Sequence, residues 1–232
     1  MHLDIIYEDE YFLAINKPAG LLVHRTRIAT EKKIFALQLL RDQVGYRVFP
    51  LHRLDRPTSG VLLFSKSSKA ANIMGNLFES RTIEKIYFAV VRGFTPDSQT
   101  IDYPLKNNEN NIVQDAITSY STLANIELPI PVGRYETCRY SLVKIRPLTG
   151  RMHQIRKHFG HIRHYIIGDT SHGDWRHNRM FKEEFSCNQL FLHAYSVKFI
   201  HPFLNKSIQI NAEFPDHFSL ILKKFKWEDL ME

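Results

Sequence analysis

The spacing of hydrophobic and polar positions along the chain predicts strands interspersed with helices. Short apolar or alternating runs bounded by turn residues indicate strands. Such runs cover residues 3–9, 11–17, 61–65, 83–93, 117–126, 138–147, 190–200 and 206–212. Apolar residues that recur every three or four positions indicate helices instead. Stretches of this kind cover residues 31–44, 67–80, 149–160 and 215–225. Because strands and helices do not alternate strictly, we expect an α+β fold, a mixed and largely antiparallel sheet flanked by helices and loops.

Local signals refine three of these segments. Ser67 precedes the helical stretch 68–80 and is a candidate N-cap. Alternation within 83–93 places Lys85, Tyr87, Ala89 and Val91 on one face of a strand. The asparagine-rich stretch KNNENN, residues 106–111, is the clearest loop.

Composition places the chain among globular proteins. With 232 residues, of which 44% are hydrophobic and 24% charged, it can bury a core, which excludes disorder as the main description. We expect a single domain over residues 1–232, with two lobes as an alternative. Its two cysteines match no metal-ligand spacing and suggest no disulfide scaffold. The acidic first residues and the lack of an apolar run of about 20 residues predict a soluble, cytoplasmic protein.

Positive charge is concentrated in one part of the chain. Residues 134–182 contain eleven Lys or Arg and three Asp or Glu, a net charge of +8, although the whole chain carries +7. Six of the twelve histidines lie there as well. Such an excess is typical of a surface that binds a polyanion, because Lys and Arg displace counterions from phosphates. A solvated basic face explains the same pattern, and charge alone does not separate the two.

The stretch LHRLDRPTSG, residues 51–60, sets one carboxylate between two arginines ahead of a turn and a buried strand. The flanking arginines favour the ionised form of Asp55, and the Pro-Thr-Ser-Gly turn holds the backbone in a tight loop. A charged acid held in this way can act as nucleophile or base. Taken alone, the same residues also describe a surface ion pair beside an ordinary turn.

Four stretches in a fixed order change this balance: AINKPAGLLVH (14–24), LHRLDRPTSG (51–60), EKIYFAVVRG (84–93) and TGRMHQIRKH (149–158). IIGD and LFLHA follow them. This ordered set resembles the RluA-type pseudouridine synthases, in which HRLDxxTSG carries the catalytic aspartate. The resemblance runs from about Ile5 to Pro215. It implies the pseudouridine synthase catalytic fold with an active-site cleft across the sheet, no separate N-terminal RNA-binding domain, no cofactor and no metal.

The resemblance assigns roles to five residues. Asp55 matches the aspartate that initiates exchange of the glycosidic bond of uridine for a carbon–carbon bond. Arg53 matches the arginine that fills the gap in the RNA stack when the uridine is flipped out. Tyr87 matches the tyrosine that stacks on the target base, and Arg151 the arginine paired with the catalytic carboxylate. Ile155 falls where the family has Leu or Ile beneath the site.

The demands of this reaction fit those residue types. Extruding a stacked base costs a few kcal/mol, and a planar guanidinium can fill the vacated space. An aromatic face can hold uracil while the base turns in its own plane. A carboxylate in a water-excluding site needs a cationic partner to stay ionised, so one acid with one arginine suffices. Sequence does not decide whether Asp55 attacks the sugar or manages protons only.

Alternatives remain open for single residues. Tyr87 also fits core filling, and Arg151 also fits capping of the helix that follows it. For Lys17 we favour a structural role, in which the Lys-Pro turn supports the catalytic loop. Candidate contacts to RNA phosphates are His24, Arg25, Lys157 and Arg163, all of which could instead face solvent.

Two other classes of protein compete with this interpretation. A zinc site in a non-catalytic basic RNA-binding module could use His153, His158, His161 and His164, but the spacing of five between the first two separates them on a helix, and no Cys or acid completes the ligand set. A hydrolase of phosphate-bearing substrates would need a metal-binding carboxylate cluster or a phosphate-cradling glycine loop, and neither motif is present.

The substrate expected from the resemblance is tRNA. The stretches RDQVG and VGRYETCRY are most similar to a tRNA-modifying branch of the family. That similarity implies a uridine in the T stem, position 65 in tRNA numbering, as the target. A ribosomal RNA target is the alternative, because synthases of both kinds share the catalytic motifs. We expect a monomer without an obligatory protein partner.

Overall fold

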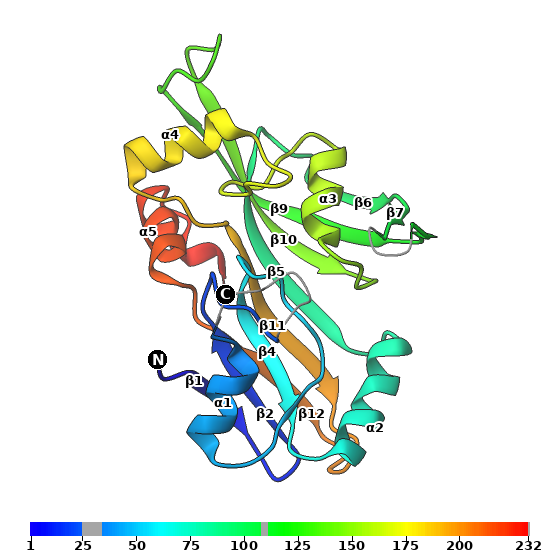
Figure 1. Ribbon diagram of the computed structural model, residues 1–232. Helices are drawn as coiled ribbons and strands as arrows, with labels where there is room; N and C mark the ends of the chain where they lie inside the picture. The colour runs from blue at the N-terminus through cyan, green and yellow to red at the C-terminus, as the bar shows by residue number, and fades with distance from the viewer. Residues whose placement is uncertain (25–33, 108–110, 232) are drawn as a thin grey trace. The chain divides into compact units, whose positions relative to one another are not determined.

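The computed structural model describes residues 1–24, 34–107 and 111–231 (Figure 1). The chain divides into two compact units. The first comprises Met1–Lys85 and Ala194–Glu213, and the second Ile86–His193 and Phe214–Glu232. No helix within the described ranges is long and apolar enough to cross a membrane.

The first unit is built on antiparallel strands covered by helices. Strand β2 pairs with β1 on one side and β4 on the other, β3 also pairs with β4, and β11 follows β4 and pairs with β12. The strand bounds are β1 (Asp4–Glu8), β2 (Phe12–Lys17), β3 (Phe49–Pro50), β4 (Ser59–Ser65), β11 (Leu192–Ile200) and β12 (Ser207–Asn211). Every residue of β4 is buried, as expected for a strand covered on both faces.

Two helices belong to the first unit, α1 (Ala36–Val44) and α2 (Ser68–Glu79). The Ser67 side chain accepts a hydrogen bond from the Ala70 N–H at 3.1 Å, so the predicted N-cap is confirmed. Apolar side chains of α2 and the sheet form one core. Its members include Phe12, Leu63, Ala70, Met74, Val197 and Ile210.

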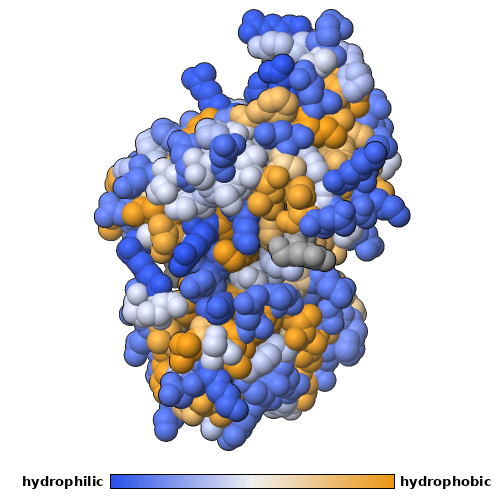
Figure 2. All heavy atoms as spheres, turned by 180° about the vertical axis from the view of Figure 1, so that it is seen from behind, coloured by the Kyte–Doolittle hydropathy of each residue, from blue (hydrophilic) through white to orange (hydrophobic). Residues whose placement is uncertain are grey.

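The second unit has strands in the order β5–β10–β9–β6, joined by antiparallel ladders. Their bounds are β5 (Glu84–Arg92), β6 (Ser98–Asp102), β9 (Ile117–Leu128) and β10 (Cys138–Pro147), and a separate two-stranded ribbon joins β7 (Leu105–Lys106) to β8 (Val113–Gln114). The β9–β10 hairpin extends past its neighbours, at the top of Figure 1. Its projecting end carries mostly hydrophilic residues with apolar ones between them (Figure 2).

Helices cover both faces of this second sheet. Helix α3 (Gln154–His161) packs through Ile155 and Phe159 on the face that carries Tyr87, Ala89 and Val91 of β5. The opposite face meets α4 (Trp175–Phe185) and α5 (Asp216–Lys224) through aromatic contacts. Tyr140 of the sheet contacts Phe181 of α4, and Phe88 contacts Phe214 just before α5, while Phe181 and Phe225 join α4 to the end of α5. The chain closes with a short 3-10 helix, η1 (Glu228–Met231).

The predicted fold class is confirmed, and most predicted elements appear within two or three residues of their expected bounds. Two helices start later than predicted, α1 at Ala36 and α3 at Gln154. The short strands β3, β6, β7 and β8 were not predicted. Helix α4 was also missed, although Asp174 caps it and its buried residues 177, 180, 181 and 185 have helical spacing.

Candidate functional site

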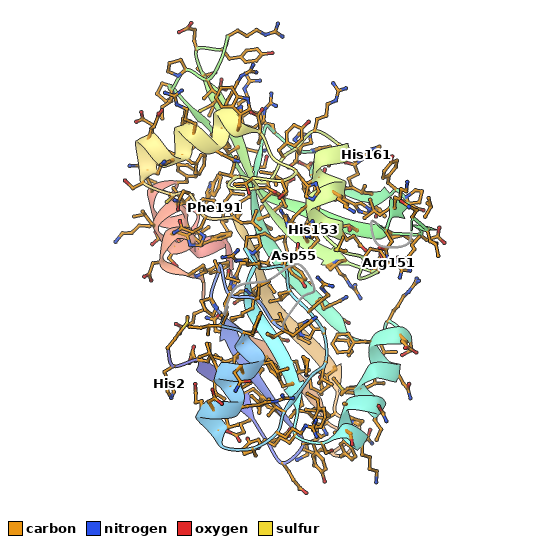
Figure 3. All side chains as sticks on the ribbon, in the orientation of Figure 1. His2, Asp55, Arg151, His153, His161 and Phe191 are labelled. Atoms are coloured by element: carbon orange, nitrogen blue, oxygen red, sulfur yellow. The ribbon has the colours of Figure 1, made fainter. Side chains whose placement is uncertain are left out.

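Asp55 lies in the loop between β3 and β4 (Figure 3). Its side chain is half-buried, whereas Arg53 and Arg56 are exposed. The Thr58 N–H donates to the Asp55 carbonyl at 3.1 Å and closes a tight turn, after which Thr58 and Ser59 are buried. The sequence therefore places a carboxylate at the surface end of a fully buried strand, on a backbone with little freedom to move.

Lys17 binds the backbone of this loop from the protein interior. Its ammonium is fully buried and donates to the carbonyls of Pro18 at 2.9 Å, Leu21 at 3.0 Å and Arg56 at 3.3 Å. Burial lowers the pKa of Lys17 to about 7, and the negative charge of Asp55 opposes this fall. Three carbonyl acceptors call for the three N–H donors of the ammonium form. These contacts agree with a structural role for Lys17.

Backbone contacts join the same two segments. The Gly20 N–H donates to the Arg56 carbonyl at 2.8 Å, and Nε of Arg56 donates to the Gly20 carbonyl at 3.0 Å. Together with Lys17, these bonds hold the 18–21 turn against the Asp55 loop. Arg56, for which the sequence suggested only local charge, thus ties the loop to its neighbour.

Gly60 ends the Thr-Ser-Gly motif at a close approach of two backbones. Its φ is +108°, and a Cβ there would lie 2.1 Å from the carbonyl oxygen of Ala194. Only glycine satisfies both conditions. The motif therefore needs glycine for packing next to the carboxylate, not for flexibility.

His52 of the same motif is held as a neutral ring. Its Nε2 accepts the Leu63 N–H of β4 at 3.1 Å. Burial and the nearby charge of Lys85 lower the pKa of His52 to about 4. The imidazole therefore anchors the loop to the strand and is unsuited to proton transfer near neutral pH.

Tyr87 and Ile155 come together in the second unit. Tyr87, half-buried on β5, packs against the core cluster that contains Ile155, itself 7% exposed. Both the core-filling and the base-stacking interpretations of Tyr87 fit this position, because one part of the ring is packed and another reaches the surface.

Arg151 is oriented by a buried amide that sequence reasoning overlooked. Oε1 of Gln154 accepts the Arg151 N–H at 3.0 Å and the Thr149 hydroxyl at 2.7 Å, and its Nε2 donates to the Ile117 carbonyl at 3.0 Å. Gln154 is only 4% exposed. Nε of Arg151 donates to the Asp115 carbonyl at 3.1 Å. A buried amide with every contact satisfied fixes the turn that presents the guanidinium.

The candidate phosphate contacts have unlike surroundings. His24 and Arg163 are exposed, and Arg163 follows α3 in a left-handed conformation with φ of +61°. Nζ of Lys157 donates to the Lys106 carbonyl at 3.3 Å. Arg25 lies outside the described residues. His24 belongs to the first unit, and Lys157 and Arg163 belong to the second.

Part of the basic segment is buried and cannot contact a polyanion. Arg156 forms a two-point ion pair with Asp169, with Nε to Oδ2 and Nη2 to Oδ1 both 2.8 Å, and the two side chains are 4% and 1% exposed. The Arg156 guanidinium keeps the pKa of Asp169 below its usual range despite burial. Counting charges along the sequence therefore overestimated the basic surface, because Arg156 does not contribute to it.

Several histidines of this segment contact one another or Tyr103. Nδ1 of His153 lies 2.9 Å from Nε2 of His172, Nε2 of His158 lies 3.0 Å from the Tyr103 carbonyl, and His161 stacks on the Tyr103 ring. His153 and His161 lie at opposite ends of α3 (Figure 3). Across the ranges described, no three His, Cys, Asp or Glu side chains gather as metal ligands would.

The structure leaves the predicted pair of Asp55 and Arg151 as a prediction, because the two residues belong to different units. Within the first unit it brings Arg53 and Asp55 into one loop, with Lys17 against that loop. Within the second unit, Tyr87 and Ile155 belong to one core cluster. The backbone of Arg151, four residues before Ile155, is held by Gln154. The first unit thus supplies a carboxylate on a rigid loop, Asp55. The second unit supplies the aromatic face of Tyr87 and the oriented guanidinium of Arg151.

Known proteins resemble this chain over nearly its full length. The model of a family described as RNA pseudouridylate synthase matches residues 11–161. The tRNA pseudouridine synthase C of Vibrio cholerae is 46% identical, covering 98% of this chain and 97% of its own. That of Haemophilus influenzae is also 46% identical, covering 98% of this chain and 100% of its own. The narrower resemblance expected from the stretches RDQVG and VGRYETCRY is confirmed.

Solved structures share the fold. The human RNA Pseudouridylate Synthase Domain Containing 1 superimposes with a TM-score of 0.72 at 24% identity, covering 94% of this chain and 86% of that one. The human RNA Pseudouridylate Synthase Domain Containing 4 superimposes with a TM-score of 0.72 at 22% identity, covering 96% of this chain and 93% of that one.

Proposed function

This chain belongs to the RNA pseudouridylate synthase family, and from that membership we propose that it converts a uridine of tRNA to pseudouridine with Asp55 as the catalytic carboxylate. In this reaction the bond between N1 of uracil and C1′ of the ribose breaks, a bond from C5 to C1′ forms, N1 gains a proton and C5 loses one. No atom is added or lost, so the reaction is an isomerisation, and we propose that it proceeds without a cofactor.

The rigid setting of Asp55 is the observation that carries this assignment. The acid sits on a loop held by the Lys17 ammonium at three carbonyls and by two Gly20–Arg56 hydrogen bonds. A carboxylate that is already held in place loses less conformational entropy when it reaches the sugar carbon or the C5 proton, so the entropic cost of positioning it is smaller. Arg151 as its ion-pair partner, Tyr87 as the face that stacks on uracil and Ile155 beneath it complete the proposed site. Arg53, exposed in the same loop, is proposed to fill the RNA stack after base extrusion.

Transfer RNA is the proposed substrate because the two relatives described above are named for it. Position 65 in the T stem is the proposed target. His24, Arg25, Lys157 and Arg163 are proposed to contact phosphates around it. We further propose that the protein is cytoplasmic and acts as a monomer.

Replacing Asp55 by Asn tests the catalytic assignment. The amide keeps the size of the side chain but carries no charge, so Asp55→Asn is expected to bind tRNA with unchanged affinity and to release no tritium from uridine labelled at C5. Asp4→Asn, an exposed acid of the same unit, is the matched control and keeps wild-type turnover. Appreciable turnover by Asp55→Asn would refute the assignment.

Pseudouridine mapping of total cellular RNA, with and without the gene, tests the substrate. We expect one tRNA position to lose its modification and ribosomal RNA to keep all of its own. Loss at a ribosomal position instead would retain the reaction but overturn the choice of RNA.

A further inference from the structure

A pocket of about 500 Å³ lies in the second unit, at the projecting end of the β9–β10 hairpin and the first turn of α4. This volume is in the range of sites that hold a nucleotide-sized ligand. Its polar lining consists of Arg92, Arg134, Tyr135, Asp174, Arg176 and His177. None of these residues has a role in the proposed reaction.

The pocket has an excess of positive charge. Arg92 pairs with Asp174 at 2.9 Å, and the second oxygen of Asp174 accepts the Arg176 N–H at 3.0 Å, so both carboxylate oxygens are engaged. Neither Arg134 nor Arg176 pairs with a carboxylate in the part of the chain that the structure describes. Two guanidinium groups are thus left to attract an anion.

Aromatic rings stand beside both of these arginines. The Arg134 guanidinium lies 5.1 Å from the Tyr135 ring centroid, and that of Arg176 lies 5.5 Å from the Trp175 ring centroid. Tyr135 is 54% exposed and Trp175 is 66% exposed. Exposed aromatic rings next to guanidinium groups are the usual platforms on which single-stranded bases stack, with the cations holding the backbone.

His177 adds a neutral group to the lining. Burial and the charge of Arg92 lower the pKa of His177 to about 4, so the ring is uncharged near neutral pH. Its Nδ1 lies 2.8 Å from the hydroxyl of the buried Tyr140. With Tyr140 as donor, the ring carries its hydrogen on Nε2, a donor suited to phosphate or base oxygens and not to cations.

We propose that this pocket binds a nucleotide of the RNA substrate other than the one isomerised, with Arg134 and Arg176 on its phosphates and the exposed ring of Trp175, which lies between the lining residues Asp174 and Arg176 in the sequence, against its base. This inference rests on the proposed function. RNA fits better than an acidic protein segment, because the rings add stacking that carboxylates cannot use.

The contact is remote from the proposed base-stacking residue. Arg92 and Tyr87 are five residues apart on β5, about 17 Å along a strand, and their side chains lie on opposite faces. The nucleotide in the pocket is therefore not a direct neighbour of the target uridine. In this proposal it belongs to a separate arm of the tRNA, which a folded, full-length tRNA carries and a short stem-loop around the uridine lacks.

The test compares two RNAs with one double variant, Arg134→Ala with Arg176→Ala. For full-length tRNA we expect Kd and KM to rise about 10- to 100-fold at unchanged kcat, since each lost charged contact is worth about tenfold. The slope of log Kd against log salt should fall by about 1 to 2. For a short stem-loop carrying the same uridine, we expect no change. Arg179→Ala, which removes a charge from α4 outside the pocket, is the matched control and should leave Kd within about twofold.

Fluorescence gives a second readout. Trp175 is exposed and Trp227 is 3% exposed, so stacking of RNA bases should quench Trp175 selectively. Trp175→Phe should abolish the quenching. Equal losses in Arg179→Ala and in the double variant, or a double variant with wild-type Kd for full-length tRNA, would overturn the inference. Failure of the proposed function is recognised separately, because wild-type protein would then modify neither RNA.

Discussion

Substitution of Gly60 by Ala tests why the motif beside the catalytic aspartate ends in glycine. Alanine would be forced into φ of +108°, a conformation that costs L-residues about 1–3 kcal/mol. Its Cβ would lie 2.1 Å from the Ala194 carbonyl oxygen, so one strand must retreat by about 1 Å. Overpacking of this size costs about 1–3 kcal/mol more.

The free energy of unfolding is therefore expected to fall by about 2–6 kcal/mol, which lowers Tm by about 4–24 °C in a chain of this size. Both tryptophans, Trp175 and Trp227, lie in the second unit, so their fluorescence does not report directly on the β4 region. Far-UV circular dichroism and amide hydrogen exchange of β4 are the suitable measurements. Turnover should fall as well, since the displaced strand carries the Asp55 loop.

Two other glycines supply graded controls. Gly45 has φ of +76° with no atom within 4 Å of a Cβ, so Gly45→Ala should cost only about 1 kcal/mol. Gly75 lies inside α2 with an ordinary backbone and open space, so Gly75→Ala should stabilise by about 0.5–1 kcal/mol. If Gly60→Ala were no worse than Gly45→Ala, the close approach to Ala194 would not constrain this position.

Two further substitutions probe buried charges. Asp169→Asn leaves the Arg156 guanidinium buried without its anion, which should cost about 3–5 kcal/mol in urea denaturation at pH 7. The pKa of Asp169 is lowered in the folded protein, so the stabilisation by its ion pair with Arg156 is complete above the unfolded pKa of about 3.9 and is lost as pH falls through the folded pKa. A difference in the free energy of unfolding between Asp169→Asn and wild type that persists undiminished at the lowest pH would contradict this. Lys17→Met leaves the Pro18 and Leu21 carbonyls without a donor, at about 1–3 kcal/mol each, and should lower turnover by loosening the Asp55 loop. Lys198→Met, at an exposed position of the same unit, should change neither quantity, and identical behaviour of the two lysine variants would refute the bracing role.

Local patterns were sufficient to predict most of the fold. The alternation in β5 correctly placed Tyr87, Ala89 and Val91 on one face, and Ser67 caps α2 as expected. These features depend on neighbours within a few positions, which a sequence displays directly. Helix α4 was missed although it is longer than α1, α3 and α5. Its segment is the most polar of these helices, and that polarity masked an apolar stripe with clear helical spacing.

Other features were decided by contacts between distant residues. Arg156 looked like part of a basic surface, yet folding buries it against Asp169. The role of Gln154 could not be predicted from the sequence, because its amide hydrogen-bonds the carbonyl of Ile117, which is distant along the chain. The pocket of Arg134 and Arg176 likewise exists only where the hairpin meets α4.

The sequence by itself determined most of the secondary structure, the family and the identity of the candidate carboxylate, since each depends on local order or on motifs in a fixed succession. Tertiary structure decided which charges face solvent, why Gly60 cannot carry a side chain and how Lys17 holds the Asp55 loop. The physical reason is that burial and close approach are set by residues far apart in the chain, and a buried charge or a missing Cβ has meaning only against the atoms that surround it.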